Sequence, residues 1–167
     1  MKATGPKACA VALFCLMSAL LAAPAARAEV SLAGTWTLVA ADVLHADGTR
    51  ARDYGAAPKG LLLIDAQGHY SLQIFKAERP HFASGDKLTG TSAEYQAAVL
   101  GSSTHFGTIS VEPAAGTLTF KIENASFPNW EATEQKRTSE LKGDELSYRV
   151  PARPDGNIPI SVWRRLR

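Results

Sequence analysis

The chain has 167 residues, with 18 lysine or arginine and 16 aspartate or glutamate side chains, and its formal net charge is +2 at pH 7. This balance argues against a protein held to nucleic acid or to an anionic membrane by a basic surface. The two cysteines, Cys9 and Cys15, both lie near the N-terminus. The rest of the chain therefore has neither a disulfide nor a cysteine nucleophile, and its length suits one domain with an ordinary hydrophobic core.

The N-terminal segment has the three parts of a secretory signal peptide. Lys2 and Lys7 precede an apolar run from Ala8 to Ala23, and Ala26-Arg27-Ala28 has the small residues that a signal peptidase requires. The alternative is a membrane anchor, but the run is shorter than the roughly 20 residues of a spanning helix. We therefore predict a signal peptide over residues 1–28, cleaved after Ala28, and a periplasmic or secreted protein without a membrane span.

Removal of this leader changes the charge of the protein. Residues 29–167 hold 15 basic and 16 acidic side chains, which gives a net charge of −1. The positive charge of the whole chain thus comes mainly from the leader, and no nucleic-acid partner is expected. We predict one domain over residues 29–167, and the sequence makes no prediction of its oligomeric state.

The folded part begins with a strand at Gly34, where Trp36 and Leu38 alternate with threonines at the two-residue period of a pleated strand. Similar alternation and turn residues recur along the chain at short spacing, including a hairpin around Asp65–Gly68. The predicted strands cover residues 34–44, 50–54, 61–64, 69–76, 105–111, 117–124, 133–141, 145–150 and 158–165.

Two stretches interrupt this rhythm. Residues 77–90 mix charge, proline and glycine over more length than a hairpin needs, and we interpret them as a loop over an opening. Thr91 to Glu94 forms a capping-box pattern, which predicts one short helix ending near Gly101. Residues 125–130 form a second irregular stretch.

Together these elements predict an all-β fold, a single up-and-down antiparallel β-barrel of about eight to ten strands with one short helix. A β-sandwich is the alternative, since periodicity alone fits both architectures.

Five motifs in order along the chain resemble those of the bacterial lipocalin-like domain family, whose members are small calycin-type barrels. They are Gly34–Val39, Pro58–Leu62, Arg79–Asp86, His105–Thr108 and Phe127–Trp130. The resemblance covers nearly all of residues 29–167. It implies a closed lipocalin-like barrel with a cavity for a small molecule.

The resemblance also implies a structural role for three residues. Gly34 and Trp36 correspond to a Gly-x-Trp opening whose tryptophan closes one end of the barrel, and a basic residue of the last strand packs across that tryptophan. Arg165 is our prediction for this residue, with Arg164 as the alternative. Burial of the Trp36 ring is favoured over direct contact with a ligand.

Candidate ligand-binding residues are aromatic, basic or histidine side chains of the predicted strands and irregular stretches. Arg137 shares a strand face with Gln135, and if that face points inward, the arginine calls for an anionic or carbonyl-bearing ligand. If it points outward, Arg137 is an ordinary surface charge. His81, Phe82 and His105 are predicted at the mouth of the barrel. The full set is Tyr70, His81, Phe82, His105, Phe106, Phe127, Trp130 and Arg137.

Nothing in the sequence assigns a catalytic residue, a metal site or a cofactor. The four histidines, which raise the possibility of metal or haem binding, have spacings that fit no short ligand motif. No nucleophile elbow or phosphate-binding loop is present. We therefore expect a protein that binds a small hydrophobic or amphipathic molecule. The alternatives are a barrel enzyme of the isomerase or cyclase type, and a packed barrel that binds another protein.

Overall fold

The computed structural model describes residues 1–2 and 31–167, so nearly all of the predicted signal peptide, residues 1–28, lies outside the described residues. The described part contains nine strands, one α-helix and one 3-10 turn. They are β1 (Gly34–Leu44), β2 (Arg50–Ala51), β3 (Lys59–Ile64), β4 (His69–Phe75), α1 (Ser92–Leu100), β5 (Ser102–Glu112), β6 (Thr117–Ala125), η1 (Pro128–Trp130), β7 (Thr133–Lys142), β8 (Glu145–Arg149) and β9 (Ile158–Arg165).

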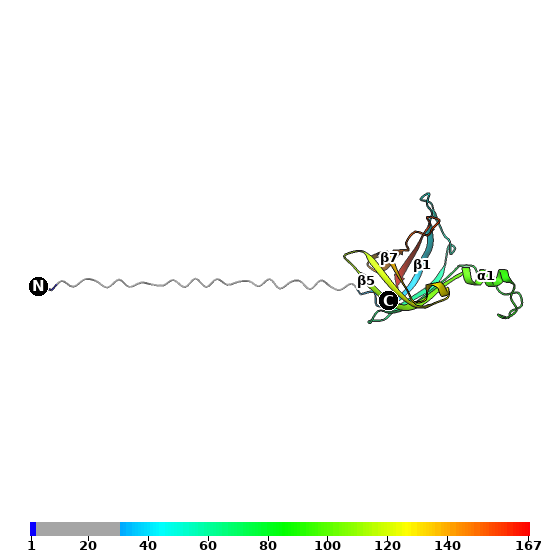
Figure 1. Cartoon of the computed structure of the whole chain (residues 1–167), viewed down its shortest axis with the longest axis horizontal. Coiled ribbons are helices and arrows are strands. Elements are labelled where there is room, and N and C mark those ends of the chain that lie inside the picture. Colours follow the sequence, from blue (N-terminus) through cyan, green and yellow to red (C-terminus); the bar gives the residue numbers. More distant parts are fainter. Residues whose placement is uncertain (3–30) are drawn as a thin grey trace.

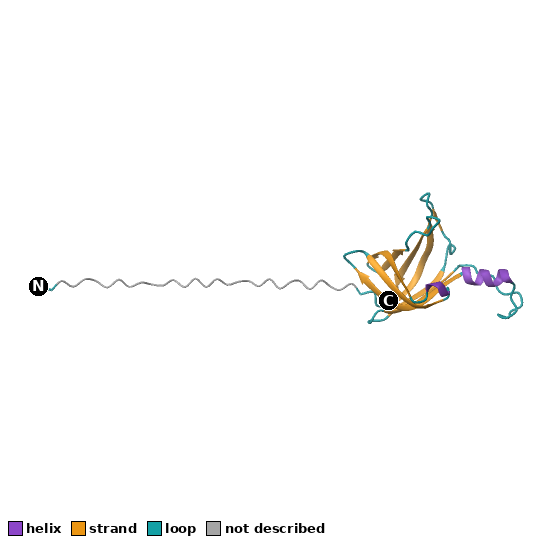
Figure 2. Ribbon diagram, in the orientation of Figure 1, coloured by secondary structure: helices purple, strands orange, loops and turns teal. Residues whose placement is uncertain are grey.

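The strands form a closed barrel (Figures 1 and 2). Strands β3 to β9 pair antiparallel in sequence order, and β1 pairs with both β3 and β9. β2 is an extra strand that pairs only with the end of β1. Closure of the sheet on itself leaves no long unpaired edge, which stabilises a small all-β protein against edge-to-edge association. The prediction of an up-and-down barrel with one helix is thus confirmed, and the sandwich is wrong.

The core lies inside the barrel because alternate residues of each strand point inward. On β4, for example, Tyr70, Leu72 and Ile74 are buried, as the sequence pattern predicts. The same alternation holds on β6, where Leu118, Phe120 and Ile122 face the interior. The side chains with the deepest burial are Trp36, Trp163, Tyr148, Phe120, Leu62, Leu72, Leu118 and Leu146.

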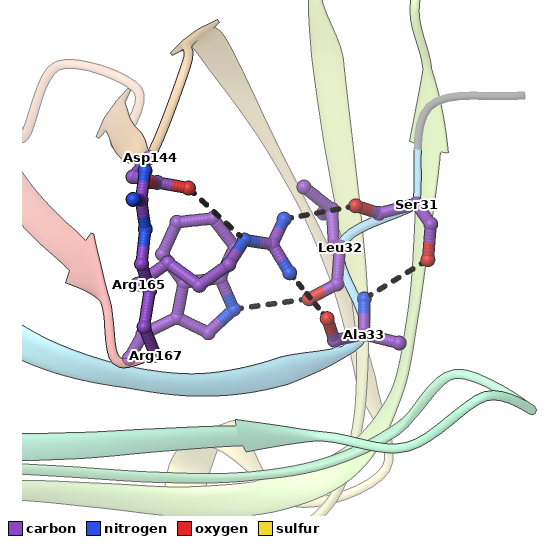
Figure 3. Close-up of polar contacts among 7 residues, drawn as sticks. Ser31, Leu32, Ala33, Asp144, Arg165 and Arg167 are labelled. Carbon is purple, nitrogen blue, oxygen red and sulfur yellow. Dashed lines mark hydrogen bonds and ion pairs between the residues drawn. The ribbon is translucent and has the colours of Figure 1, made fainter. Parts of the chain in front are cut away.

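One end of the barrel, the floor, holds the stacked side chains of Trp36 and Arg165, and Figure 3 shows the Arg165 guanidinium directed at Ser31 and Ala33. The Trp36 ring has no exposed surface, and its Nε1 donates to Leu32 O at 3.0 Å. The Arg165 guanidinium carbon lies 4.1 Å from the centre of that ring. Arg165 also donates to the carbonyls of Ser31, at 3.0 Å, and of Ala33. The floor contacts therefore join the last strand, β9, to the segment that precedes β1.

The structure decides between the two arginines of the last strand. Arg165 is the one that stacks on Trp36, whereas the Arg164 guanidinium forms an exposed ion pair with Glu145. Gly34 lies beside the floor with a φ of +136°, a backbone conformation that side chains disfavour. A Cβ atom at this position would lie 3.0 Å from Arg165 Nη1. Glycine thus leaves room for the guanidinium.

The segment between β4 and β5 differs from its predicted position. It carries α1, which has the predicted capping box between Thr91 and Glu94 but buries no side chain. Figures 1 and 2 show α1 projecting away from the barrel. Phe82 packs edge-on against Tyr95, with their ring centres 5.3 Å apart. This segment, residues 76–101 and here called the excursion, is therefore held mainly by contacts within itself. The prediction that residues 77–90 form a loop over the barrel opening is therefore wrong.

Strand limits also differ by two residues or more at three places. The strand predicted over residues 50–54 is only β2, because the chain turns at Asp53 and Tyr54. β3 and β5 start two and three residues earlier than predicted. In β5 Ser102, Ser103 and Thr104 pair with β4, and this polar run lacks the alternation of apolar and polar residues from which the other strands were predicted.

Candidate functional site

The interior above the core is hollow. A cavity of about 590 Å³ lies among the inner faces of β1, β4, β5 and β7 to β9. Its volume falls within the roughly 300 to 1,000 Å³ of typical small-molecule sites. Ala41, Val43, Ile74 and Pro159 supply apolar walls. The rim comes from three connections, through Asp53 and Tyr54, Trp130 of η1, and Val150, Pro151 and Arg153.

Arg137 is the central charged group of this cavity. It lies on β7, on the face that turns into the barrel, and only 6% of the residue is exposed. Its guanidinium carbon is 4.2 Å from the ring centre of Phe120 and 5.0 Å from that of Tyr148. The inward orientation is therefore the correct one of the two alternatives for this strand face.

The polar contacts of Arg137 are incomplete. Its Nη2 donates to Gln135 Oε1 at 2.9 Å, and this uncharged amide is its only hydrogen-bond partner within residues 31–167. The Nε atom is buried without a partner, and the described residues provide no carboxylate within ion-pair distance. Burial of a cation without a counter-charge is costly, so this arrangement is typical of a binding group rather than of a stabilising one.

His105 lies on β5 and is held by Tyr70 of β4. The Tyr70 hydroxyl is 2.7 Å from His105 Nδ1, and both residues are buried. The register explains the contact: Tyr70 pairs with Gly107, which has no side chain, and His105 pairs with the next inward residue, Leu72. The His105 ring also packs edge-on against Phe120 and Trp130. Because Nδ1 is occupied by Tyr70, Nε2 is the ring nitrogen left to meet a ligand.

Burial sets the charge state of this pair. Burial, together with the nearby charge of Arg137, lowers the pKa of His105 from 6.5 to about 3. Burial also raises the pKa of Tyr70 well above its ordinary value of 10.0. At neutral pH both side chains are therefore uncharged, and each hydrogen bond that they form is one between neutral groups.

The structure brings together four of the eight predicted ligand-binding residues. His105, Trp130 and Arg137 line the cavity, and Tyr70 lies behind His105. His105 is only 4% exposed, so its predicted position at the mouth is wrong, and it lies in the buried wall instead. The physical reason is that β5 begins at Ser102, which moves His105 from a strand end to the strand interior.

The other four predicted residues lie outside the cavity. His81 and Phe82 belong to the excursion that carries α1 and line a separate pocket there. Phe106 points outward because it follows the inward His105 on the same strand, and it is exposed. Phe127 is also exposed and packs on the ring of Trp130 at 5.5 Å. These four positions are corrections to the predicted site.

Three further residues of the site were not predicted from the sequence. Tyr148 of β8 and Gln135 of β7 line the cavity. The ring of Phe120 on β6 contacts the Arg137 guanidinium and the His105 ring. The Tyr148 hydroxyl is buried, and no residue of the described chain forms a hydrogen bond with it. The alternation of Leu146 and Tyr148 on a short strand is the signal that could have placed this tyrosine inside.

The four histidines occupy separate places. His45 contacts Asn157, His69 contacts Asp65, and His81 and His105 lie in the excursion and the barrel. Among the described residues, no three histidine, cysteine or acidic side chains gather as metal ligands would.

Among the helices of the described residues, none has the length and apolar character needed to cross a bilayer.

Known proteins were compared with the chain. None of the curated proteins matches it. A crystal structure of a lipocalin-like protein from Bacteroides uniformis ATCC 8492 is 16% identical, with a TM-score of 0.42, over 81% of this chain and 98% of that one. An uncharacterized protein from Bacteroides eggerthii DSM 20697 is 12% identical, with a TM-score of 0.42, over 81% of this chain and 100% of that one.

The family assignment rests on the sequence itself. Residues 33–166 match the family model described as the lipocalin-like domain. This range includes all the strands of the barrel as well as Trp36 and Arg165 of the floor. It also agrees with the resemblance indicated by the five sequence motifs. The chain therefore belongs to the lipocalin-like domain family.

Proposed function

We propose that this protein binds one small amphipathic molecule inside the barrel. The observation that carries the proposal is the cavity of about 590 Å³ with the buried, incompletely paired guanidinium of Arg137 in its wall. A packed barrel would have no such space, and a purely structural interior would not keep a charge there.

The distribution of side chains supports an amphipathic ligand. The apolar residues Ala41, Val43 and Pro159 contact the cavity from β1 and β9, whereas Arg137 and His105 contact it from β5 and β7. A molecule with an apolar body and one polar end would match both surfaces. Trp130 at the rim offers a large face for further apolar contact.

Native mass spectrometry of protein purified from its own host tests this proposal. The wild-type protein should retain a small molecule that denaturation releases. Ala41→Trp, which fills the cavity from β1, should lose the molecule but keep a cooperative unfolding transition. Val39→Trp is the matched control, because Val39 lies on the exposed face of the same strand. Equal retention by Ala41→Trp, or no binding by the wild type of any compound in an amphipathic set, would contradict the proposal.

A reaction in the same cavity is a second candidate function. It is favoured by the neutral His105, which Tyr70 orients at 2.7 Å beside the charge of Arg137. A neutral imidazole N–H next to a guanidinium, both able to polarise a carbonyl, suits an isomerase or a cyclase. Chromatography of the released molecule before and after prolonged incubation with the protein tests this function. Conversion that His105→Gln abolishes would support it, and an unchanged molecule would exclude it for that ligand.

We also propose that the protein is exported, with cleavage after Ala28 and a periplasmic or secreted location. The positive start, apolar run and small residues of the leader support this. The floor uses carbonyls from Ser31 onward, so such cleavage leaves its contacts intact. Fractionation of the native host and N-terminal sequencing test the proposal. Full-length protein in the cytoplasmic fraction would contradict it.

A further inference from the structure

We propose that the polar end of the ligand is a single carboxylate, held by the Arg137 guanidinium and by the Nε2–H group of a neutral His105 whose tautomer Tyr70 sets. This inference rests on the proposed function, because it names the chemical class of the molecule in the barrel. Its three residues come from β4, β5 and β7, and no sequence motif joins them.

The two donors both pack against the Phe120 ring. The Arg137 guanidinium carbon is 4.2 Å from the centre of the Phe120 ring, and the centre of the His105 ring is 5.6 Å from the same point. Both residues line the same cavity. They therefore belong to one polar patch, surrounded by Phe120, Tyr148 and Trp130, where exclusion of water strengthens their interactions with an anion.

The charges around the cavity favour one negative charge on the ligand. The one buried and incompletely paired charge of the lining is that of Arg137, because Asp42 is ion-paired with Arg50 at 2.7 Å and the other charged lining residues are exposed. A single guanidinium compensates one negative charge, so a dianion such as a phosphate monoester would keep an uncompensated charge. A cationic ligand would meet Arg137, and a neutral ligand would leave its charge unpaired. A monocarboxylate avoids all three costs.

Tyr70 acts as a positioning residue. A phenol is a better proton donor than an imidazole N–H, so the Tyr70 hydroxyl donates to His105 Nδ1 across their 2.7 Å contact. The imidazole proton then resides on Nε2, the nitrogen that is free for the ligand. The low pKa of His105 keeps the ring uncharged, so it offers a donor without adding a second positive charge.

Isothermal titration calorimetry with decanoate, 1-decanol and decylammonium at pH 8 tests the carboxylate. Decanoate should bind wild-type protein at least about tenfold more tightly than decanol, because a charge-assisted hydrogen bond is worth that factor. Decylammonium should bind most weakly. Equal or tighter binding of decanol or decylammonium would overturn the inference while supporting the proposed function. No binding of any of the three, together with no native ligand, would contradict the proposed function itself.

Two arginine variants provide a matched pair. Arg137→Met should lose at least about tenfold in decanoate affinity and leave decanol affinity within about threefold. Arg164→Met removes an exposed, ion-paired arginine of β9 that does not line the cavity, and it should change both affinities by less than about threefold. If Arg137→Met does not fold, Arg137→Gln replaces it. An equal loss in the Arg164 variant, or none in the Arg137 variant, would overturn the role of Arg137.

Nitrogen-15 NMR of the imidazole rings tests the role of Tyr70, with His105→Gln used to assign the signals. In the wild type His105 should show a protonated Nε2 and an unprotonated Nδ1 at pH 8. In Tyr70→Phe the signals should move towards a mixture of tautomers, and decanoate affinity should fall about three- to tenfold. A protonated Nδ1 in the wild type would contradict the proposed donor, and an unchanged spectrum in Tyr70→Phe would contradict the positioning.

Discussion

The barrel holds two arginines that stack on aromatic rings at almost the same distance. In the floor, Arg165 lies 4.1 Å from the ring centre of Trp36, and in the cavity Arg137 lies 4.2 Å from that of Phe120. Their polar surroundings differ. Arg165 donates to two main-chain carbonyls and lies 3.9 Å from Asp144, whereas Arg137 has one amide partner within the described chain.

This difference separates a structural arginine from a binding one. Stacking on an aromatic face contributes about 0.5 to 2 kcal/mol in either place. In the floor, the guanidinium also donates to two carbonyls and has the counter-charge of Asp144 at 3.9 Å, so the group stabilises the fold. In the cavity, the loss of hydration is compensated only in part, and stability improves when an anion arrives. Removal of Arg165 should therefore destabilise the fold, whereas removal of Arg137 should weaken ligand binding and leave the fold stable.

The largest effect is expected at the centre of the floor. Trp36→Ala should lower the free energy of unfolding by about 3 to 5 kcal/mol, because it opens a cavity beneath Arg165 in the most buried part of the core. Chemical denaturation measures the loss. Trp130→Ala, at the half-buried rim, is the control and should lose less than half as much. A loss below 1 kcal/mol for Trp36→Ala would rule out its role as a floor plug.

A pH dependence should come from the cavity wall. His105 stays neutral in the folded protein down to a pKa of about 3, whereas the unfolded chain takes up a proton near 6.5. The unfolded state therefore binds more protons between these values, and stability present above pH 6.5 should be lost as the pH falls towards 3. The contribution reaches at most about 1.4 kcal/mol per pH unit.

Urea denaturation from pH 7 to pH 3 measures this contribution as the difference between wild type and His105→Phe, which has no imidazole to titrate. The wild type should lose more stability over this range than the variant does. Parallel curves for the two proteins would mean that His105 is accessible to protons in the folded state, in conflict with its burial. Arg164→Met, on the outer face of β9, should follow the wild-type curve.

A smaller effect is expected for the floor arginine. Arg165→Met should lower the free energy of unfolding by about 1 to 3 kcal/mol, through the lost stacking and the carbonyls of Ser31 and Ala33 left without their donor. Arg164→Met, next to it in an exposed ion pair, should change stability by less than about 0.5 kcal/mol. Equal losses in the two variants would remove the distinction between these neighbours.

The smallest effect on stability is expected at the cavity arginine. Arg137→Met should leave the free energy of unfolding of the ligand-free protein within about 1 kcal/mol of wild type, or raise it, because an apolar chain of similar length replaces an incompletely paired charge. Thermal unfolding of the ligand-free wild type and variant measures this difference in stability. A loss as large as that of Arg165→Met would show that both arginines serve the fold, and the comparison would then fail.

The sequence predicted the floor better than the cavity. Alternation placed the inward residues of β4 and β6, and the position of Trp36 at the start of a strand indicated the closed end. On β7 it left both faces open. At the cavity, Arg137 and Trp130 were named as candidates, but Tyr148 and Phe120 were not. A strand pattern states which residues share a face, and it does not state which strands meet across a barrel or at what height.

By itself, the sequence determined an antiparallel all-β fold and its capped helix, because these depend on alternation, turn residues and capping within short stretches of chain. Only the tertiary structure decided where α1 projects, that Arg137 points inward, and that the hydroxyl of Tyr70 meets His105, 35 residues further along the chain. Those outcomes depend on strand register and on closure between β1 and β9, which no local segment encodes.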